Sequence, residues 1–146
     1  MGIRTEEILS AREAALMSPL QLAFLGDTVW ELMVRSRLVA HRENVHHLHQ
    51  HAVLKVKASS QATSLHRIEQ VLTDEEKEIV RRGRNAHARH PAPKHQEQAD
   101  YQAATGFEAL MGYLYLTGQE ERIRELYLIL ENDEGGEEIA SGSSEG

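Results

Sequence analysis

The fold is decided by the stretch Leu22-Ala23-Phe24-Leu25-Gly26-Asp27-Thr28-Val29-Trp30-Glu31-Leu32. Its apolar residues recur at the spacing of an amphipathic helix, and an acidic residue, Asp27, lies in the middle of the apolar run. Burying a lone carboxylate costs several kcal/mol unless a proton, a hydrogen bond or a cation compensates its charge. The placement of Asp27 therefore indicates a functional carboxylate on a packed helix.

A second stretch repeats this arrangement with Glu108 as the embedded acid. It reads Thr105-Gly106-Phe107-Glu108-Ala109-Leu110-Met111-Gly112-Tyr113-Leu114-Tyr115-Leu116. Two such helices, each with a carboxylate beside small residues, can pack closely and hold a divalent metal between them. Mg²⁺ prefers oxygen ligands and keeps several waters, so two carboxylates suffice when phosphate supplies further oxygens. Spacing alone leaves open the alternative that both are exposed acids at helix edges.

The rest of the sequence also predicts helices and no β-strand, so we expect an all-α helical bundle. Ser18 and Thr73 each begin a capping box, which marks the start of a helix. Asn44 is a further expected N-cap. The expected helices cover residues 5–15, 18–39, 44–60, 61–72, 73–83, 100–116 and 119–130. One domain, residues 1–130, accommodates all of them.

Residues 131–146 differ in composition from the rest of the chain. They carry six of the 23 acidic residues and no Lys or Arg, and Gly, Ser and Glu dominate. The formal net charge of −7 comes almost entirely from this segment, because residues 1–130 hold 17 acidic and 16 basic side chains. We expect an acidic, disordered tail here.

The basic residues of the body cluster between residues 81 and 95, where no acid occurs. They are Arg81, Arg82, Arg84, Arg89 and Lys94. Two of the three prolines lie between residues 83 and 98, and this segment predicts a loop. A positive loop on a near-neutral body favours a polyanion such as RNA. Two alternatives stay open: a solvated charge run, and basic side chains that only favour the negative end of a helix dipole.

Composition excludes several classes of protein. The 146 residues include no cysteine, so neither disulfides nor a thiolate zinc site can form. No apolar run reaches the roughly 18 residues of a membrane span, and the start of the chain lacks a hydrophobic signal region. We therefore expect a cytoplasmic protein with no membrane partner. All nine histidines lie between His41 and His95, and although His47 and His51 are one helical turn apart, no third ligand completes a metal site.

These motifs together resemble those of ribonuclease III catalytic domains. The family's signature helix is similar to Phe24-Leu25-Gly26-Asp27-Thr28-Val29 with the following Glu31-Leu32, and its second metal-binding helix is similar to Phe107-Glu108-Ala109-Leu110-Met111-Gly112. The closer resemblance is to Mini-ribonuclease III, a small bacterial subgroup that consists of the catalytic domain alone. Its basic loop looks like Arg81-Arg82-Gly83-Arg84-Asn85-Ala86 followed by Pro93-Lys94. The resemblance covers roughly residues 18–126.

The resemblance implies the helical bundle of a ribonuclease III endonuclease domain, assembled as a dimer. It implies that Asp27 and Glu108 are the catalytic residues and the ligands of Mg²⁺, with Mn²⁺ as a substitute. The chain departs from full-length ribonuclease III at Ala23 and Thr105, where that enzyme has a glutamate and an aspartate. The four-carboxylate cluster of the full-length enzyme is thus reduced to two, as in the mini subgroup.

The same resemblance implies where the partner subunit lies. In ribonuclease III enzymes the signature helix is at a two-fold dimer interface, which places Phe24 and Trp30 near the partner. A symmetric pair of subunits explains how one short domain cuts both strands of a duplex, because each subunit contributes one catalytic centre.

The implied activity is Mg²⁺-dependent cleavage of double-stranded RNA by a homodimer, in the maturation of the 23S ribosomal RNA precursor. Hydrolysis by metal-activated water leaves a 5′-phosphate and a 3′-hydroxyl. The expected RNA contacts are Arg81, Arg82, Arg84, Asn85 and Lys94. A ribosomal protein is left open as a further partner. Ala23 and Thr105 also keep an alternative function open, that of a non-catalytic helical RNA-binding or ribosome-associated module.

Overall fold

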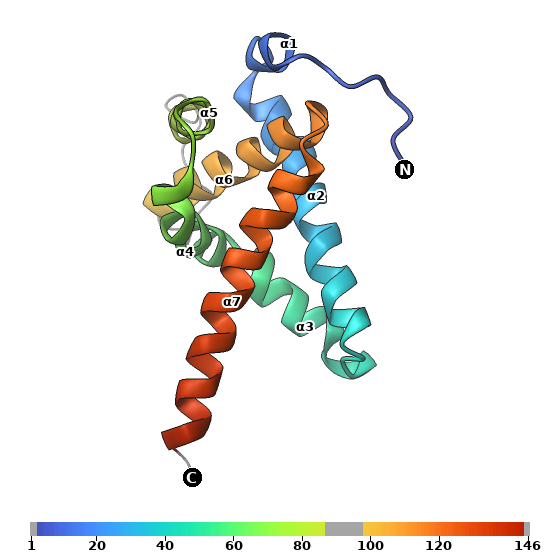
Figure 1. Cartoon of the computed structure of the whole chain (residues 1–146), viewed down its shortest axis with the longest axis vertical. Helices are drawn as coiled ribbons and strands as arrows, with labels where there is room; N and C mark the ends of the chain where they lie inside the picture. The colour runs from blue at the N-terminus through green and yellow to red at the C-terminus, as the bar shows by residue number, and fades with distance from the viewer. Residues whose placement is uncertain (1–2, 87–97, 145–146) are drawn as a thin grey trace.

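The computed structural model describes residues 3–86 and 98–144, with side chains as far as residue 132. The described part is helical and contains no strand, so the all-α prediction is confirmed. The elements, drawn in Figure 1, are α1 Ala11–Ala15, α2 Pro19–Ala40, α3 Val45–Val56, α4 Ala58–Ile68, the 3₁₀ turn η1 Glu69–Val71, α5 Asp74–Asn85, α6 Gln98–Leu116 and α7 Glu120–Ser144. None of these helices is long and apolar enough to cross a membrane.

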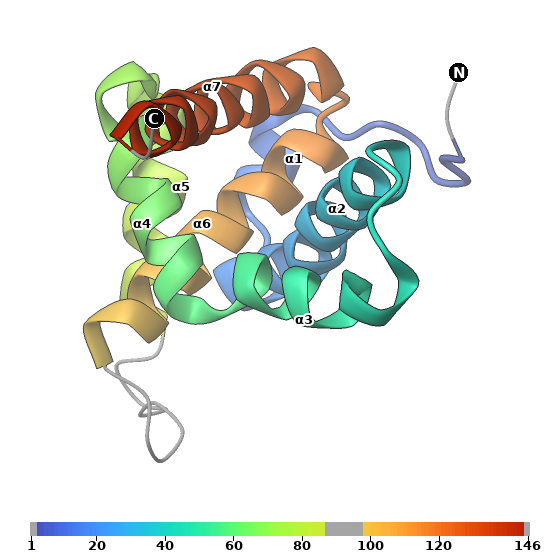
Figure 2. The same ribbon diagram turned by 90° about the horizontal axis from the view of Figure 1, so that it is seen from below.

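The central helix is α6, which passes between α2 on one side and α4 and α5 on the other (Figure 2). Every residue from Ala103 to Leu114 is buried except Glu108, which keeps part of its surface exposed. A helix that is apolar on nearly all sides belongs in the middle of a bundle. Glu108 is therefore the one point in this run where the central helix reaches the surface of the chain.

An aromatic cluster joins α2, α6 and α7. The Trp30 ring packs edge-on against Phe107, with ring centroids 4.9 Å apart, and lies 5.5 Å from the Tyr127 ring. Its indole N–H donates to the Lys55 carbonyl at 3.4 Å. With only 4% of its surface exposed, Trp30 belongs to the core of a single chain. Phe24, in contrast, is 85% exposed. The expectation that both residues lie near a partner subunit stays a prediction.

The predicted helix starts at Ser18, Asn44 and Thr73 are confirmed. The Ser18 and Thr73 side chains accept hydrogen bonds in complete capping boxes, and Asn44 accepts from the backbone N–H of His46. Each cap satisfies N–H groups that a helix start leaves unpaired. These short polar signals locate helix starts well because their partners lie within a few residues.

The Thr73 capping box contains Glu76, which is also part of a buried ion pair. Glu76 is 3% exposed and receives two hydrogen bonds of 2.9 Å from Arg122 on α7. Burial acts to raise the pKa of Glu76, but hydrogen bonds from Arg122 and from the Thr73 backbone outweigh it, so its pKa is lowered. This pair fastens the start of α5 to α7.

The first and third predicted helices are shorter in the structure than expected. The helix expected over residues 5–15 begins only at Ala11, because Ser10 caps it and Leu9 instead donates its N–H to the Leu116 carbonyl. The helix expected over residues 44–60 breaks at Lys57, whose backbone is extended (φ −66°, ψ 156°). The chain then turns into α4, and η1 follows before Leu72.

Helix α5 ends later than predicted, at Asn85 rather than near Gly83. Gly83 lies inside the helix and packs directly on α6. A Cβ on Gly83 would lie 2.7 Å from the Gly106 Cα. Helix α6 begins at Gln98, so both ends of the predicted loop over residues 83–98 are helical. Residues 87–97, with Arg89 and Lys94, lie outside the described residues.

The last helix also continues beyond the prediction. We expected the last helix to end near Leu130, and the structure continues α7 to Ser144. Glu131 forms an ion pair with Arg37 of α2, which carries the packed part of α7 past Leu130. The division into a domain of residues 1–130 and a tail of residues 131–146 stays a prediction.

Candidate active site

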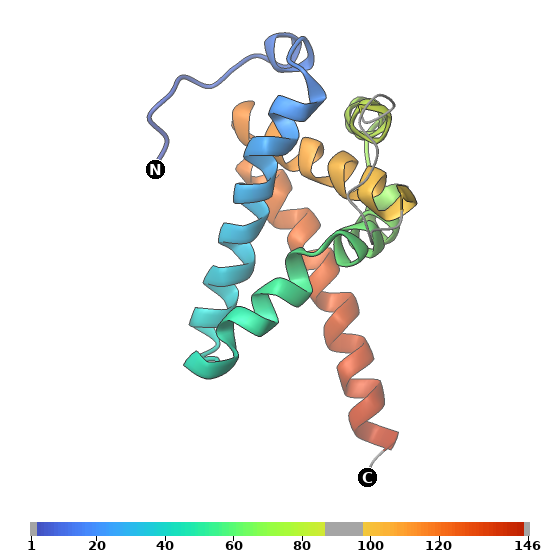
Figure 3. The same cartoon turned by 180° about the vertical axis from the view of Figure 1, so that it is seen from behind.

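The candidate site lies where α2 crosses α6, in the C-terminal half of α6 (Figure 3). The two backbones meet at a pair of glycines. A Cβ on Gly26 would lie 1.6 Å from the Glu108 carbonyl oxygen, and a Cβ on Gly112 would lie 1.9 Å from the Leu22 carbonyl oxygen. No side chain fits at either position, so the glycines permit an approach that any other residue would prevent.

This crossing brings together the two acids that the sequence singles out. Asp27 directly follows Gly26, and Glu108 supplies the carbonyl that Gly26 touches. Asp27 is exposed and Glu108 is partly buried, so the pair lies at the edge of the core and is open to solvent.

Electrostatics shows that the two carboxylates interact. Burial is the largest cause that raises the pKa of Glu108 to about 8, and the negative charge of Asp27 is the second. The pKa of Asp27 is also raised, first by burial and then by the charge of Glu31. Within residues 3–86 and 98–132, no ion pair neutralises either acid.

An uncompensated pair of this kind fits a hard divalent cation. The pKa values of Asp27 and Glu108 are raised, and no positively charged group acts to lower them. A bound cation would supply this positive charge. The described residues contain no group of three or more His, Cys, Asp or Glu side chains that could hold a metal ion. A cation at Asp27 and Glu108 would therefore take its other ligands from water or phosphate, as Mg²⁺ commonly does.

A third acid, Glu31, lies beside this pair, and sequence reasoning gave it no role. It follows Asp27 by one helical turn and raises the pKa of Asp27. Glu31 also accepts a hydrogen bond from Arg35, one further turn along α2. The i, i+4 spacing of Asp27, Glu31 and Arg35 was the available signal, because these three positions share one side of the helix.

At the two positions where this chain departs from full-length ribonuclease III, neither side chain is a carboxylate. Thr105 is buried and its hydroxyl donates to the Tyr101 carbonyl at 3.0 Å, inside its own helix. Ala23 is buried and carries no polar atom. The site therefore depends on the Asp27 and Glu108 carboxylates.

The predicted RNA-binding arginines of α5 have partners within the protein. Arg81 forms hydrogen bonds with Glu78 at 2.6 and 2.9 Å, and Arg84 pairs with Glu69 at 2.6 Å. These partners are carboxylates on or next to the same helix. Their role in RNA binding stays a prediction, as does that of Lys94, which lies outside the described residues.

Arg82 and Asn85, the other two predicted contacts on α5, differ from each other. Asn85 is exposed at the end of the helix. The Arg82 guanidinium instead donates to the carbonyl of Ala15, the last residue of α1, and to that of Met17, just after the helix. Arg82 thus satisfies carbonyl groups at the end of a short helix, and this holds α1 against α5.

Comparison with known proteins agrees with this geometry. Residues 20–119 match the model of the Ribonuclease III domain family. The chain is 50% identical to a Mini-ribonuclease 3 of Symbiobacterium thermophilum over 111 aligned residues. The alignment covers 75% of this chain and 85% of the relative. A Mini-ribonuclease 3 of Thermoanaerobacter sp. is 46% identical over 125 residues, which span 85% of this chain and 87% of the relative.

A solved structure has the same fold. The crystal structure of a protein from Fusobacterium nucleatum superposes with a TM-score of 0.74 at 33% sequence identity, and the match covers 82% of this chain and 95% of that one. The matched family model includes both α2 and α6, which carry the two carboxylates. The chain belongs to the Mini-ribonuclease 3 family of ribonuclease III-domain endoribonucleases.

Proposed function

We propose that this endoribonuclease cleaves double-stranded RNA with Mg²⁺, and that Asp27 and Glu108 are its catalytic and metal-binding residues. The observation that carries the proposal is the uncompensated carboxylate pair at the α2–α6 crossing, with the pKa of Glu108 raised to about 8. A cation that is bound by only two carboxylates keeps its other coordination positions for water and for a phosphodiester oxygen. Mn²⁺ would substitute, because it accepts the same oxygen ligands.

The site residues perform two tasks in this reaction. When bound, Mg²⁺ supplies positive charge next to phosphorus and lowers the pKa of a water molecule. Glu108 must lose its proton before it can bind a cation, because only the carboxylate form is a ligand. Asp27 supplies the second carboxylate, and the glycine crossing holds the two acids in register. Water attacks phosphorus and the 3′ oxygen leaves, so the products carry a 5′-phosphate and a 3′-hydroxyl.

We further propose that the enzyme acts as a homodimer built on the outer side of α2. Leu20 and Phe24 are one helical turn apart and both are exposed, Phe24 to 85%. Apolar side chains repeated along one side of a helix are typical of an isologous interface. Such a dimer would carry two copies of the Asp27–Glu108 pair, one for each strand of the duplex.

RNA contacts are proposed for the C-terminal part of α5 and the segment after it. Arg81 and Arg84 form ion pairs on the surface, and such pairs contribute little to stability. Both arginines can therefore exchange a carboxylate for a phosphate at small cost. Asn85 and Lys94 complete the proposed set, and Arg82 belongs to it less directly, because it positions α1 through the Ala15 and Met17 carbonyls.

The natural substrate that we propose is the duplex flanking the 23S ribosomal RNA precursor, in the cytoplasm. This rests on the resemblance of the Asp27 and Glu108 motifs and of the basic segment to Mini-ribonuclease III. A ribosomal protein as helper partner is a further proposal. A non-catalytic RNA-binding module is the rival function, and it would bind the duplex without cutting it.

A cleavage assay separates these functions. A perfect RNA duplex is incubated with the protein and Mg²⁺, with and without EDTA, and the ends of any fragments are analysed. We expect 5′-phosphate and 3′-hydroxyl ends, no product with EDTA, and no product from Asp27→Asn or Glu108→Gln. Glu121→Gln is the matched control, because Glu121 is an exposed acid on α7. Unchanged cleavage by Asp27→Asn would remove the proposed mechanism.

A further inference from the structure

The acid Glu31 lies on α2 one helical turn after Asp27, and the fold itself gains little from it. Its ion pair is formed with Arg35 of the same helix, and the two side chains are 34% and 62% exposed. An exposed i, i+4 pair contributes little to stability, and this one joins no two helices. A carboxylate at this position therefore requires an explanation other than packing.

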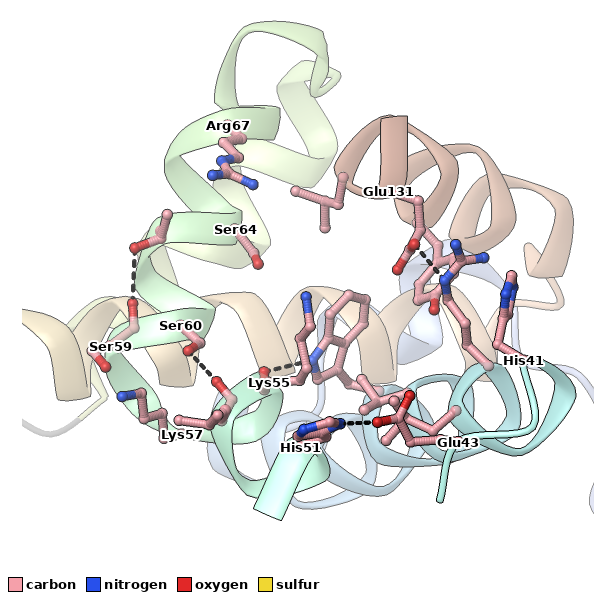
Figure 4. Close-up of a pocket in the computed structure, with 18 residues that line it drawn as sticks. His41, Glu43, His51, Lys55, Lys57, Ser59, Ser60, Ser64, Arg67 and Glu131 are labelled. Atoms are coloured by element: carbon pink, nitrogen blue, oxygen red, sulfur yellow. Dashed lines mark hydrogen bonds and ion pairs between the residues drawn. The ribbon is translucent and has the colours of Figure 1, made fainter. Parts of the chain in front are cut away.

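Other carboxylates near α2 do fasten parts of the fold together. Glu131 of α7 pairs with Arg37 of α2, and Glu43 pairs with His51 of α3 (Figure 4). Both carboxylates line a cavity of about 830 Å³ between α2, α3, α4 and α7, and Glu31 does not line it. Glu31 thus differs from these acids in place and in contacts, and its neighbour on α2 is the candidate active site.

Helical register and one hydrogen bond locate the Glu31 carboxylate. Residues four apart on a helix have Cβ atoms about 5–6 Å apart, so Asp27 and Arg35 lie beside Glu31 on the same side of α2. Arg35 donates to Oε1 of Glu31, and in the described part of the chain Oε2 accepts no hydrogen bond. Glu31 is therefore held by one oxygen and keeps a second oxygen as an acceptor.

Glu31 is close to Asp27 without completing a three-ligand site. Its negative charge contributes to the raised pKa of Asp27, whereas the charge that acts on the pKa of Glu108 is that of Asp27. Glu31 thus lies on the Asp27 side of the pair. Among the side chains that the structure describes, no three acids or histidines are placed to hold a metal ion together. This is the position of a group that reaches a cation through water rather than directly.

We propose that Glu31 is a positioning residue of the cleavage reaction: its carboxylate accepts a hydrogen bond from a water molecule in the hydration shell of the cation that Asp27 and Glu108 bind. The inference rests on the proposed function, because it requires a cation at that pair. Mg²⁺ keeps several waters when few protein ligands bind it, so acceptors beside the site orient those waters. Arg35 holds the Glu31 carboxylate in place.

Mn²⁺ binding tests this role without relying on cleavage. Electron paramagnetic resonance of free Mn²⁺ gives the Kd of the metal for the full-length protein in the absence of RNA. We expect Glu31→Gln to weaken Mn²⁺ binding by about tenfold or more, as loss of an outer-shell partner commonly does. Glu31→Asp should also weaken it, because this variant keeps the charge but withdraws the carboxylate by one methylene. Glu121→Gln removes an exposed acid of α7 and should bind Mn²⁺ as the wild type does.

Cleavage and assembly are measured on the same variants. At saturating Mg²⁺, Glu31→Gln should still cleave duplex RNA about tenfold or more slowly than the wild type, because the waters of the cation lose their acceptor. Thermal unfolding in EDTA should show a folded variant, since Glu31 lies outside the buried core. Light scattering should give the wild-type mass. A changed mass in Glu31→Gln would assign Glu31 to a subunit interface and overturn the proposal.

Asp27→Asn separates failure of this inference from failure of the proposed function. If the wild type binds no Mn²⁺, or Asp27→Asn binds it equally well, the cation site is wrong and the role of Glu31 is wrong with it. If Asp27→Asn loses Mn²⁺ while Glu31→Gln keeps the wild-type Kd and cleavage rate, the inference about Glu31 alone is overturned. Wild-type affinity in Glu31→Asp, with weak binding in Glu31→Gln, would also overturn it, because Glu31 would then act through its charge at a distance.

Discussion

Glu108 is the residue on which the site depends most. It is the one partly exposed position in the buried run from Ala103 to Leu114, and its carboxyl has a pKa of about 8 in the absence of metal. Near neutral pH the metal-free protein therefore holds a proton on this side chain. A group with a strongly perturbed pKa at the edge of a core is a typical functional residue.

The raised pKa of Glu108 predicts how stability depends on pH. Between the unfolded pKa of 4.5 and the folded value of about 8, the folded protein keeps a proton that the unfolded chain releases. The free energy of unfolding in EDTA should therefore fall as pH rises through this window, by at most about 1.4 kcal/mol per pH unit. Glu108→Gln has no such proton and should lack this contribution. Urea unfolding of both proteins measures it, and equal slopes would contradict the assignment.

The same proton predicts how Mg²⁺ binding depends on pH. Mg²⁺ and the proton compete for the Glu108 carboxylate, so affinity should rise with pH and level off above about 8. Binding below this value should release a proton into the buffer. Calorimetry in two buffers with different ionisation enthalpies measures the release. Affinity that does not change between pH 6 and pH 8 would show that Glu108 is not a ligand.

The crossing of α2 and α6 positions the two carboxylates. Gly26→Ala or Gly112→Ala would place a methyl group against backbone of the other helix, where no flexible side chain can move aside. We expect each to lower the free energy of unfolding by about 2 kcal/mol or more. Cleavage should fall more than stability explains, because the carboxylates separate. Urea unfolding and cleavage rates measure this, with Ser36→Ala, an exposed position on α2, as control. Wild-type stability of both glycine variants would contradict the close crossing.

The arginines of α5 should divide into two functional groups. Arg82→Ala leaves the Ala15 and Met17 carbonyls without their donor, which should cost about 1–3 kcal/mol of stability. Arg81→Ala and Arg84→Ala should leave stability almost unchanged and weaken duplex binding, with a shallower salt dependence. Thermal unfolding and binding at several salt concentrations separate the two effects. Equal loss of binding in all three, at equal stability, would show that Arg82 contacts RNA directly.

Helix starts were predictable from sequence and one helix break was not. Capping boxes at Ser18 and Thr73 use residues close in the chain, so local sequence specifies them. The break at Lys57 depends on tertiary contacts. The Lys55 carbonyl accepts from the Trp30 indole, and the Leu54 carbonyl accepts from the Ser60 hydroxyl, so these acceptors do not need a continuous helix. No Gly or Pro marks the position.

Asp27 and Glu108 could be singled out from the sequence, but the contacts formed elsewhere in the fold could not. Asp27 and Glu108 each interrupt an apolar run, which is visible in sequence alone. The partner of Arg82 lies 65 to 67 positions away in the chain, and the cavity needs four helices to enclose it. Contacts of this kind follow from packing, which residue spacing does not specify. The family resemblance supplied the expected fold but not these contacts.

The proposed homodimer makes a prediction about the whole assembly. Phe24→Glu places a charge on the exposed apolar side of α2, so we expect a folded monomer that cleaves duplex RNA poorly. Val39→Glu is the matched control, because Val39 is also apolar and 65% exposed on α2. Light scattering after size exclusion gives the mass of each variant. A Phe24→Glu protein that stays dimeric would place the interface elsewhere.

The central claim is that Asp27 of α2 and Glu108 of α6 bind one divalent cation between them. A crystal structure of the enzyme with Mn²⁺, with the ion located by its anomalous scattering, tests this most directly. We predict a peak at the α2–α6 crossing, bound by carboxylate oxygens of Asp27 and Glu108 directly, at about 2.0–2.2 Å, or through its water ligands. An occupied Mn²⁺ site elsewhere, with neither carboxylate in its coordination or hydration shell, would contradict the account.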